Sequence, residues 1–372
     1  MKSFTQDMTL GLETLGEARA WIIDRISCCA VAGQVDLLSA EIAVGEVLQN
    51  IVRYAYRGSG PVTLRVSDLD EAVAITVFDE APPSDPNSWD NEKAPTDGGL
   101  GLSVIKNAID ACSFRPLPVG NRASIYFFPN QSGFGSVPLK WAGELLEARA
   151  ANETISSWIK VCESSGLVEP RVIEALHRCG DALVDQENKQ AQIPQYHNTK
   201  HFLDVFISAI HWLETQRDSD VIAGMLLVAA LMHDYNHPGE LPKPQESGQS
   251  VESVSTELFR QLFEGSALLN PCEIDLTSDM ILDTEPGRVE PFATEWSRLF
   301  NALDISASMI PWLGISLTKA LVEEQMLGDD VGAVYASFVR SRSEYQISVV
   351  GGLLEPWYRL TLERLSDQRL SW

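Results

Sequence analysis

The segment Leu226–Gly239, LLVAALMHDYNHPG, constrains the fold of this chain more than any other. Its apolar run ends at Met232 and leads directly into His233 and Asp234, with His237 three residues further on. The run is too short to span a membrane and is typical of a buried helix. A buried helix that ends in His-Asp brings two polar groups into apolar surroundings, where they must be hydrogen-bonded or bind a metal.

The histidines of the chain are grouped. Of the six, four fall in two short clusters, at His197 and His201 and at His233 and His237. Histidines that served only as core or surface residues would not group in this way. The segment LDIS adds a carboxylate further along the chain, at Asp304. Imidazole and carboxylate ligands suit zinc, iron, manganese or magnesium. The set therefore predicts a metal site, and it resembles the ligand pattern of the HD metal-dependent phosphohydrolases.

Further motifs in the same order resemble the class I 3′,5′-cyclic nucleotide phosphodiesterases. The segments are YHNTKHFLDVF (196–206), HDYNHPG (233–239), SDMILDTEP (278–286), NALDIS (301–306) and EEQMLGDD (323–330). The first two resemble the family's YHN-x-x-H-x-x-DV and HD-x-x-HPG signatures, and the last resembles its E-x-x-x-QGD motif. Gln346 lies ten residues before Pro356, the family's spacing between its purine-binding glutamine and a later proline. The resemblance covers about the last 190 residues.

This resemblance implies a two-metal site that hydrolyses cAMP, cGMP or both. The expected ligands of a first metal, zinc or iron, are His201, His233, Asp234 and Asp304. Asp234 would also bridge to a second metal, magnesium or manganese. Two metals that share a water lower its pKa and hold the phosphoryl oxygens during attack.

The resemblance also implies roles for the residues around the metals. His197 would be the general acid that protonates the departing 3′-oxygen, and His237 would contact water on the metals. Tyr196 and Gln346 are expected to bind substrate, Gln346 through the purine edge. Val349 stands where the family has the aromatic residue that stacks on the base.

Composition and charge limit the class of protein. At 372 residues the chain is long enough for two cores, and 45% hydrophobic with 22% charged residues is ordinary for a globular protein. The net charge of −24 argues against a general binder of nucleic acid or anionic membranes, which needs a basic surface. No signal peptide or membrane-spanning run is evident, and the six cysteines show no C-x-x-C spacing. We expect reduced thiols and a cytoplasmic protein.

The first 130 residues carry the pattern of an α/β sandwich. Strands are expected at 5–14, 61–67, 72–79 and 123–128, and helices at 17–29, 38–56 and 100–112. Residues 80–99 form a long loop rich in proline, aspartate and glycine, which is typical of a functional lid or a disordered piece.

Three features of this domain carry chemistry. Glu46 and Asn50 are four residues apart and share one face of a helix. Asp79 ends an apolar strand, and Gly99 and Gly101 open a helix whose backbone N–H groups could hold a phosphate. In this order, SAEIAVGEVLQNIVRYAY, DEAPPSDP and GGLGLSVIKNAID resemble the nucleotide-binding boxes of the GHKL ATPases, in the branch of the anti-sigma-factor serine kinases.

That resemblance implies a Bergerat-type ATP-binding fold and a set of roles. Asn50 would ligate the Mg²⁺ of bound ATP, and Glu46 would orient or deprotonate an acceptor hydroxyl. Asp79 would bind the adenine amino group, and Gly99 and Gly101 would lie beside the phosphates. Ala81 stands where the family has a glycine.

The expected architecture is therefore α+β with two domains. A histidine-kinase-like ATPase domain at 1–130 is followed by a linker at 131–140 and an all-α HD-type phosphodiesterase domain at 141–372. The glycine- and serine-rich segment NQSGFGSVP (130–138) is the basis for this linker. In the last domain helices are expected at 141–151, 155–164, 170–186, 201–215, 221–233, 250–264, 271–281, 294–309, 315–327, 330–345 and 347–365.

Two other functions are open to such a chain. One is a partner-switching regulator, in which the kinase-like domain binds a sigma factor or phosphorylates its antagonist while the helical domain senses a nucleotide. The other is an HD hydrolase of a different phosphoester. A general acid at His197 favours an enzyme, because a sensor needs none. The chain could also form a homodimer.

Overall fold

The computed structural model divides into two compact units. One comprises Met1–Glu153 with Glu163–Ser165, and the other comprises Thr154–Cys162 and Gly166–Trp372. Each unit is described by itself. The residues described are 1–84, 105–131, 133–190, 192–216, 221–238, 250–285, 292–325 and 330–366.

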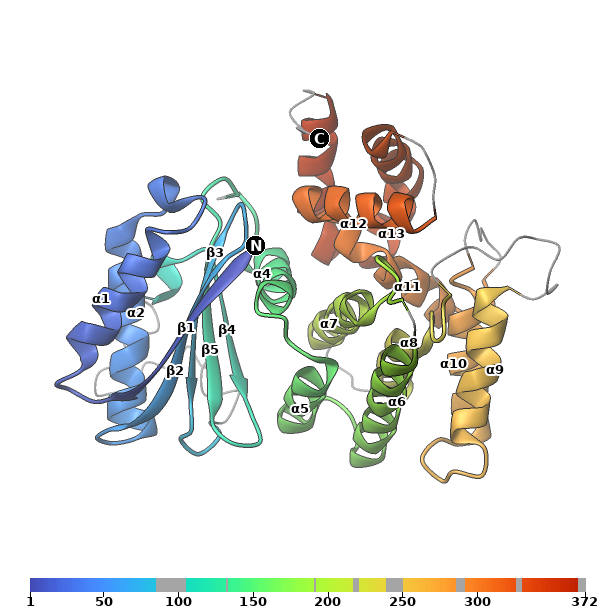
Figure 1. The fold of residues 1–372 in the computed structure, drawn as a ribbon, viewed down its shortest axis with the longest axis horizontal. Helices are drawn as coiled ribbons and strands as arrows, with labels where there is room; N and C mark the ends of the chain where they lie inside the picture. The colour runs from blue at the N-terminus through green and yellow to red at the C-terminus, as the bar shows by residue number, and fades with distance from the viewer. Residues whose placement is uncertain are drawn as a thin grey trace. The chain divides into compact units, whose positions relative to one another are not determined.

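The first unit is built on an antiparallel sheet with the strand order β1-β2-β3-β5-β4. The strands are β1 (Lys2–Leu10), β2 (Gly60–Asp68), β3 (Val73–Asp79), β4 (Ala111–Pro116) and β5 (Asn121–Phe127). Helices α1 (Leu15–Ile26) and α2 (Leu37–Asn50) lie on one side of this sheet, and α4 (Ser136–Ala150) lies on the other (Figure 1). The expected α/β fold of this part of the chain is confirmed.

The main core of the first unit lies between the sheet and helices α1 and α2. Alternate residues of a strand face the same side, so one face of the sheet is apolar. Leu64, Ile75 and Ile125 project from three strands into this core, where Val44 and Leu48 of α2 meet them. All five side chains are buried.

Helix α4 belongs to the first unit, so this unit extends beyond the linker expected at 131–140. The helix packs against β2, β4 and β5 on the polar face of the sheet. Two buried acidic residues of the helix, Glu144 and Glu147, pair there with arginines of the sheet, and Gly143 lies against the ring of Tyr126. A helix with buried carboxylates at these positions needs a partner surface that carries opposite charge.

The helix expected at 100–112 is partly wrong, because its last residues are a strand. Residues 105–108 are helical, but β4 begins at Ala111 and pairs with β5 along its whole length. The sequence of β4, ACSFRP, has no strong alternation of apolar and polar residues, so its pairing with β5 decides its structure. Gly99 and Gly101 lie outside the described residues.

The second unit is helical wherever it is described with regular structure, as expected. Its helices are α5 (Ile155–Ser165), α6 (Pro170–Lys189), α7 (Thr199–Thr215), α8 (Val221–Met232), α9 (Val251–Phe263), α10 (Pro271–Leu282), α11 (Glu295–Asp304), η4 (Ser306–Met309), α12 (Pro311–Glu324) and α13 (Val331–Ser366). The helices expected at 330–345 and 347–365 correspond to the two parts of α13, which are separated by a kink at Val350. None of the described helices combines the length and apolar character needed to cross a bilayer.

Gly120 is a position where the fold requires glycine. It joins β4 to β5 with φ +86°, and a Cβ there would lie 1.7 Å from the carbonyl oxygen of Asp79. We expect Gly120→Ala to destabilise the first unit by about 1–3 kcal/mol, since both the backbone and the β3 end must shift. Hydrogen exchange of β3 and β5 amides at increasing urea measures this. Gly16→Ala is the control, because its Cβ meets nothing within 4 Å; equal stability of both variants would contradict the argument.

Candidate functional site

Four side chains from three helical segments converge on one point in the second unit. His201 comes from the first turns of α7, His233 and Asp234 follow directly after α8, and Asp304 is the last residue of α11. Their separations show the convergence: the Nε2 atoms of His201 and His233 are 3.1 Å apart. Each of these nitrogens lies 3.2–3.4 Å from Oδ2 of Asp234 and from Oδ1 of Asp304.

Local sequence explains why these segments begin and end where they do. Asn198 caps α7, because its side-chain oxygen accepts the backbone N–H of Lys200 at 2.9 Å. The apolar side chains of α8 from Met225 to Met232 are wholly buried, which holds the following His-Asp pair inside the unit. Ser306, two residues after Asp304, hydrogen-bonds Ser208 of α7 at 3.0 Å.

This geometry fits a metal ion. Ligand atoms about 2.1 Å from one ion, at tetrahedral or octahedral angles, lie about 3.0–3.4 Å from one another. The two histidine nitrogens lie within this range of each other and of each carboxylate oxygen, and His201, His233 and Asp304 form a group that could hold one ion. Oδ1 of Asp304 is buried and has no hydrogen-bond partner among the described residues, although two histidine nitrogens lie near it. An acceptor left in this way is costly unless a cation uses it. The ligands expected from the sequence, His201, His233, Asp234 and Asp304, are thus brought together.

Electrostatics support the same interpretation. Burial alone lowers the pKa of His233, but the charges of Asp234 and Asp304 outweigh it and raise this pKa to about 10. Burial raises the pKa of Asp304, but the charge of His233 and the nearby ring nitrogens of both histidines outweigh this and lower it to about 2. The centre therefore favours positive charge among its four groups.

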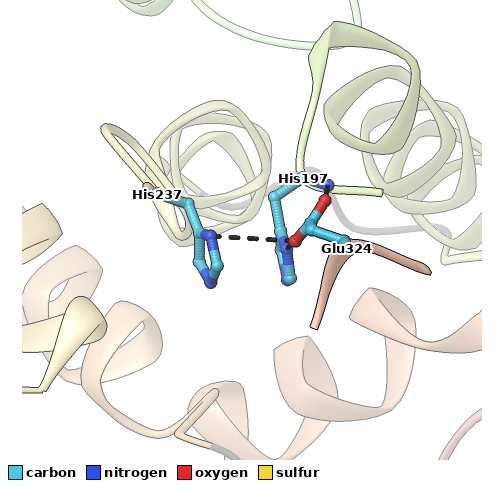
Figure 2. Close-up of side chains that lie close together, drawn as sticks. All are labelled: His197, His237 and Glu324. Atoms are coloured by element: carbon cyan, nitrogen blue, oxygen red, sulfur yellow. Dashed lines mark hydrogen bonds and ion pairs between the residues drawn. The ribbon is translucent and has the colours of Figure 1, made fainter. Parts of the chain in front are cut away.

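A second cluster lies beside the first and is formed by His197, His237 and Glu324 (Figure 2). Nδ1 of His197 is hydrogen-bonded to Oε1 of Glu324, and Oε2 of Glu324 accepts the backbone N–H groups of Tyr196 at 2.6 Å and His197 at 3.1 Å. Nε2 of His197 lies 3.8 Å from Oδ2 of Asp234, so this nitrogen faces the first cluster. Glu324 therefore sets the orientation of His197.

The second cluster could supply ligands to a metal, but its geometry suits a proton better. The rings of His197 and His237 are stacked, with centroids 3.6 Å apart and planes 14° apart. The lone pairs of two nearly parallel imidazoles do not meet at one point, as a shared ion would require. Burial and the charge of His197 lower the pKa of His237 to about 4, so His237 is neutral at pH 7. Burial raises the pKa of Glu324, but the bonds from His197 outweigh this and lower it.

Sequence reasoning missed Glu324. The segment EEQMLGDD contains two adjacent glutamates that the sequence does not distinguish. Only the contact between His197 and Glu324, which are 127 residues apart in the sequence, shows which of them is hydrogen-bonded to His197. The expectation that His237 contacts water on the metals stays a prediction, since its clearest contact is the ring of His197.

The three expected substrate residues, Tyr196, Gln346 and Val349, differ in how near they lie to the first cluster. The ring of Tyr196 lies 4.7 Å from that of the ligand His201. Gln346 is buried and donates through Nε2 to the backbone oxygen of Ala302 at 3.2 Å, while its Oε1 has no partner among the described residues. It lies close in space to the segment that ends in Asp304.

Val349 is not brought to the metal ligands. It lines a hollow of about 280 Å³ together with Trp212, Trp296 and neighbouring residues. Trp212 is eleven residues after His201 on α7, which is about 16 Å along the helix axis. The two tryptophan rings meet edge to face with centroids 6.0 Å apart.

In the first unit, Asp79 is held at the end of β3 and is buried. Its Oδ1 accepts the side-chain amide of Asn121 at 2.9 Å and the backbone N–H of Ala81 at 2.9 Å. Burial raises the pKa of Asp79, and these two hydrogen bonds act against that rise. Ala81 is not among the described residues with positive φ, so alanine meets no backbone strain where the resembled family has glycine.

Glu46 and Asn50 lie half-buried on α2, as the sequence predicts. Asn50 is the last α-helical residue, and the π-helical turn η2 (Ile51–Ala55) follows it. Such turns are frequent at functional sites. Just beyond this turn, the hydroxyl of Tyr56 accepts the backbone N–H of Glu80 at 2.7 Å, which links the end of α2 to the end of β3.

Comparison with known proteins identifies the first unit. Residues 8–127 match the family model of the histidine kinase-like ATPase domain, a range that includes the end of β1, strands β2 to β5, and helices α1 and α2. A search of curated proteins gave no match to the chain. The chain thus contains an N-terminal histidine kinase-like ATPase domain, which confirms that part of the sequence prediction and supports ATP as a ligand.

The metal site makes a direct prediction. We expect purified protein to contain bound transition metal, and we expect Asp234→Ala to lose it, because Asp234 lies within 3.4 Å of both ligand histidines. Elemental analysis of the two proteins measures this. His211→Ala is the control, since His211 is equally buried on α7 but lies outside the cluster. Equal metal in wild type and Asp234→Ala would contradict the site.

Proposed function

We propose that the second unit is a metal-dependent phosphohydrolase, and that its substrate is a 3′,5′-cyclic nucleotide such as cAMP or cGMP. The observation that carries this proposal is the grouping of His201, His233 and Asp304, with Asp234 within 3.4 Å of both histidine nitrogens and Nε2 of His197 facing Asp234. Four ligands beside an oriented histidine are the elements needed for hydrolysis of a phosphodiester with acid assistance. The choice of a cyclic nucleotide rests on the motif resemblance.

His201, His233, Asp234 and Asp304 would hold the first metal, zinc or iron, and Asp234 would share a second, magnesium or manganese. Bound divalent ions supply Lewis acidity toward the phosphoryl oxygens and lower the pKa of water. The protein's own part is to place the acid. Because Glu324 engages Nδ1 of His197, Nε2 is the nitrogen that can donate a proton.

In the proposed reaction, water attacks phosphorus and the bond from phosphorus to the 3′-oxygen breaks. His197 gives its Nε2 proton to the departing oxygen, and the proton lost by the water restores His197 through solvent. The carboxylate of Glu324 stabilises the protonated form of His197 and fixes its tautomer when neutral. The product is the nucleoside 5′-monophosphate.

The first unit, in this proposal, binds ATP with Mg²⁺ and regulates the chain. Asn50 would ligate Mg²⁺ and Asp79 would bind the adenine amino group. Hydrogen bonds from Asn121 and Ala81 leave Asp79 oriented for this task.

A second candidate is the partner-switching regulator that acts on a sigma factor or its antagonist. It is favoured by the retention of Glu46 one turn before Asn50, because ATP binding alone does not need a base. Phosphorylation of a protein by the first unit would establish this candidate.

Catalysis should separate from metal binding. We expect His197→Ala to lower kcat by about 10²–10⁴-fold with the metal content unchanged. Glu324→Gln should lower kcat also, because the amide cannot stabilise a charged His197. Both are measured by product release from cAMP and cGMP, assayed with Zn²⁺, Mn²⁺ and Mg²⁺.

The control for this test is Asp234→Ala, which should lose activity and metal together. Should wild-type protein hydrolyse neither cyclic nucleotide under any metal condition, the substrate assignment is wrong. Loss of metal from His197→Ala would show instead that His197 is a ligand.

Nucleotide binding gives a further prediction. We expect the full chain to bind ATP with Mg²⁺, and Asp79→Ala to weaken binding by about 10- to 100-fold through loss of a hydrogen bond to a charged group. Asn50→Ala should remove the dependence on Mg²⁺. Calorimetric titration measures both, with Glu41→Ala as control, because Glu41 is an exposed residue of the same helix. Unchanged binding in both variants would place the nucleotide elsewhere.

A further inference from the structure

The sheet face under α4 is charged. Arg65 of β2, Arg115 of β4 and Arg122 of β5 meet acidic residues of α4 and of the residues just after it. Glu144 and Glu147 of α4 are fully buried, at 0% exposure. Buried carboxylates remain ionised only when cations and hydrogen-bond donors surround them.

The contacts are short and numerous. Nε and Nη2 of Arg115 donate to the two oxygens of Glu144, both at 2.6 Å. Glu147 accepts Nη2 of Arg122 at 2.9 Å and the hydroxyl of Thr76 at 2.5 Å. Both oxygens of each carboxylate are therefore engaged by the sheet. Glu144 binds through the edge strand β4, whereas Glu147 binds through β3 and β5.

Glu147 thus contacts the two strands that carry the predicted adenine site. On β5, Arg122 follows Asn121 directly, and consecutive side chains of a strand point to opposite faces. Arg122 faces α4, while Asn121 donates to Oδ1 of Asp79 at 2.9 Å. In the sheet register Arg122 lies opposite Phe78, and Asn121 lies opposite Asp79.

Guanidinium groups hold this register from the α4 side. The ring of Phe78 lies 4.7 Å from the guanidinium carbon of Arg65 and 5.7 Å from that of Arg122. Both arginines also pair with Glu153, three residues beyond the end of α4. Glu153 therefore holds one arginine on each of the strands β2 and β5, which flank β3 in the sheet.

The docking of α4 is of a kind that can be reversed. Buried ion pairs contribute little net stability, because desolvation offsets most of the attraction. Trp141, Leu145 and Leu146 of the same helix are buried as well. The chain continues from α4 into α5.

We propose that docking of α4 is thermodynamically linked to nucleotide binding at Asp79, which makes α4 the element through which the first unit regulates the rest of the chain. The linkage runs from Glu147 through Arg122 to Asn121 and Asp79. It rests on the proposed ATP binding and adds the route of regulation to it. Linkage is reciprocal: nucleotide stabilises the docked helix, and the docked helix strengthens nucleotide binding.

The test uses the full chain and ATP with Mg²⁺. Saturating nucleotide should slow hydrogen exchange of the α4 amides by about 2- to 30-fold, the range that coupled residues give. Asp79→Ala should abolish that change. Glu147→Gln should weaken ATP binding by a similar factor in calorimetric titration.

The matched control is Glu144→Gln. It changes the same kind of buried carboxylate on the same helix, but its partner lies on β4, so ATP affinity should fall less than in Glu147→Gln. If Glu147→Gln does not fold, the exchange measurement on wild type still decides the question. ATP binding with no change in α4 exchange would overturn the linkage alone, whereas absence of ATP binding would overturn the proposed ligand and the linkage together.

Discussion

The second unit depends on holding four charged or polar ligand groups at one point inside an apolar environment. Nε2 of His233 lies 3.2 Å from a carboxylate oxygen on either side, and its ring is fully buried. Buried groups this close together are stable only if positive charge balances the two carboxylates. The helices that carry the histidines and the carboxylates therefore cannot shift independently. The apolar α8, the Asn198 cap of α7 and the Ser306–Ser208 bond hold the three segments in place.

His197, beside this centre, is positioned by a distant part of the chain. Glu324, the last residue of α12, accepts two backbone N–H groups and the ring of His197. The stacked ring of His237 covers His197 from one side and stays neutral. The carboxylate of Glu324 thus fixes both the backbone before α7 and the ring of His197. This explains how His197, which lies just before the start of a helix, obtains a single orientation.

Buried charge has a different role in the first unit. There the Glu–Arg contacts join a helix to a sheet, and the carboxylates of Glu144 and Glu147 determine which strands the helix can contact. Ion pairs of this kind select one arrangement more than they stabilise it, because each misplaced carboxylate would be buried without a partner. Asp79, the predicted adenine-binding residue, lies at the end of the same strands, where it is paired in register with Asn121.

The sequence by itself determined the features that depend on local pattern. Residue type and order predicted His201, His233, Asp234 and Asp304 as metal ligands, the apolar run predicted α8, and the N-terminal boxes predicted the ATPase domain that the family match confirms. Only the tertiary structure decided β4, the partner Glu324 and the position of α4, and it placed Val349 in the hollow beside Trp212. The physical reason is that the local sequence of β4, or of Glu324 among many glutamates, does not indicate which distant residues it will contact. Contacts formed by distant residues, and the cost of leaving buried polar groups unpaired, determine those features.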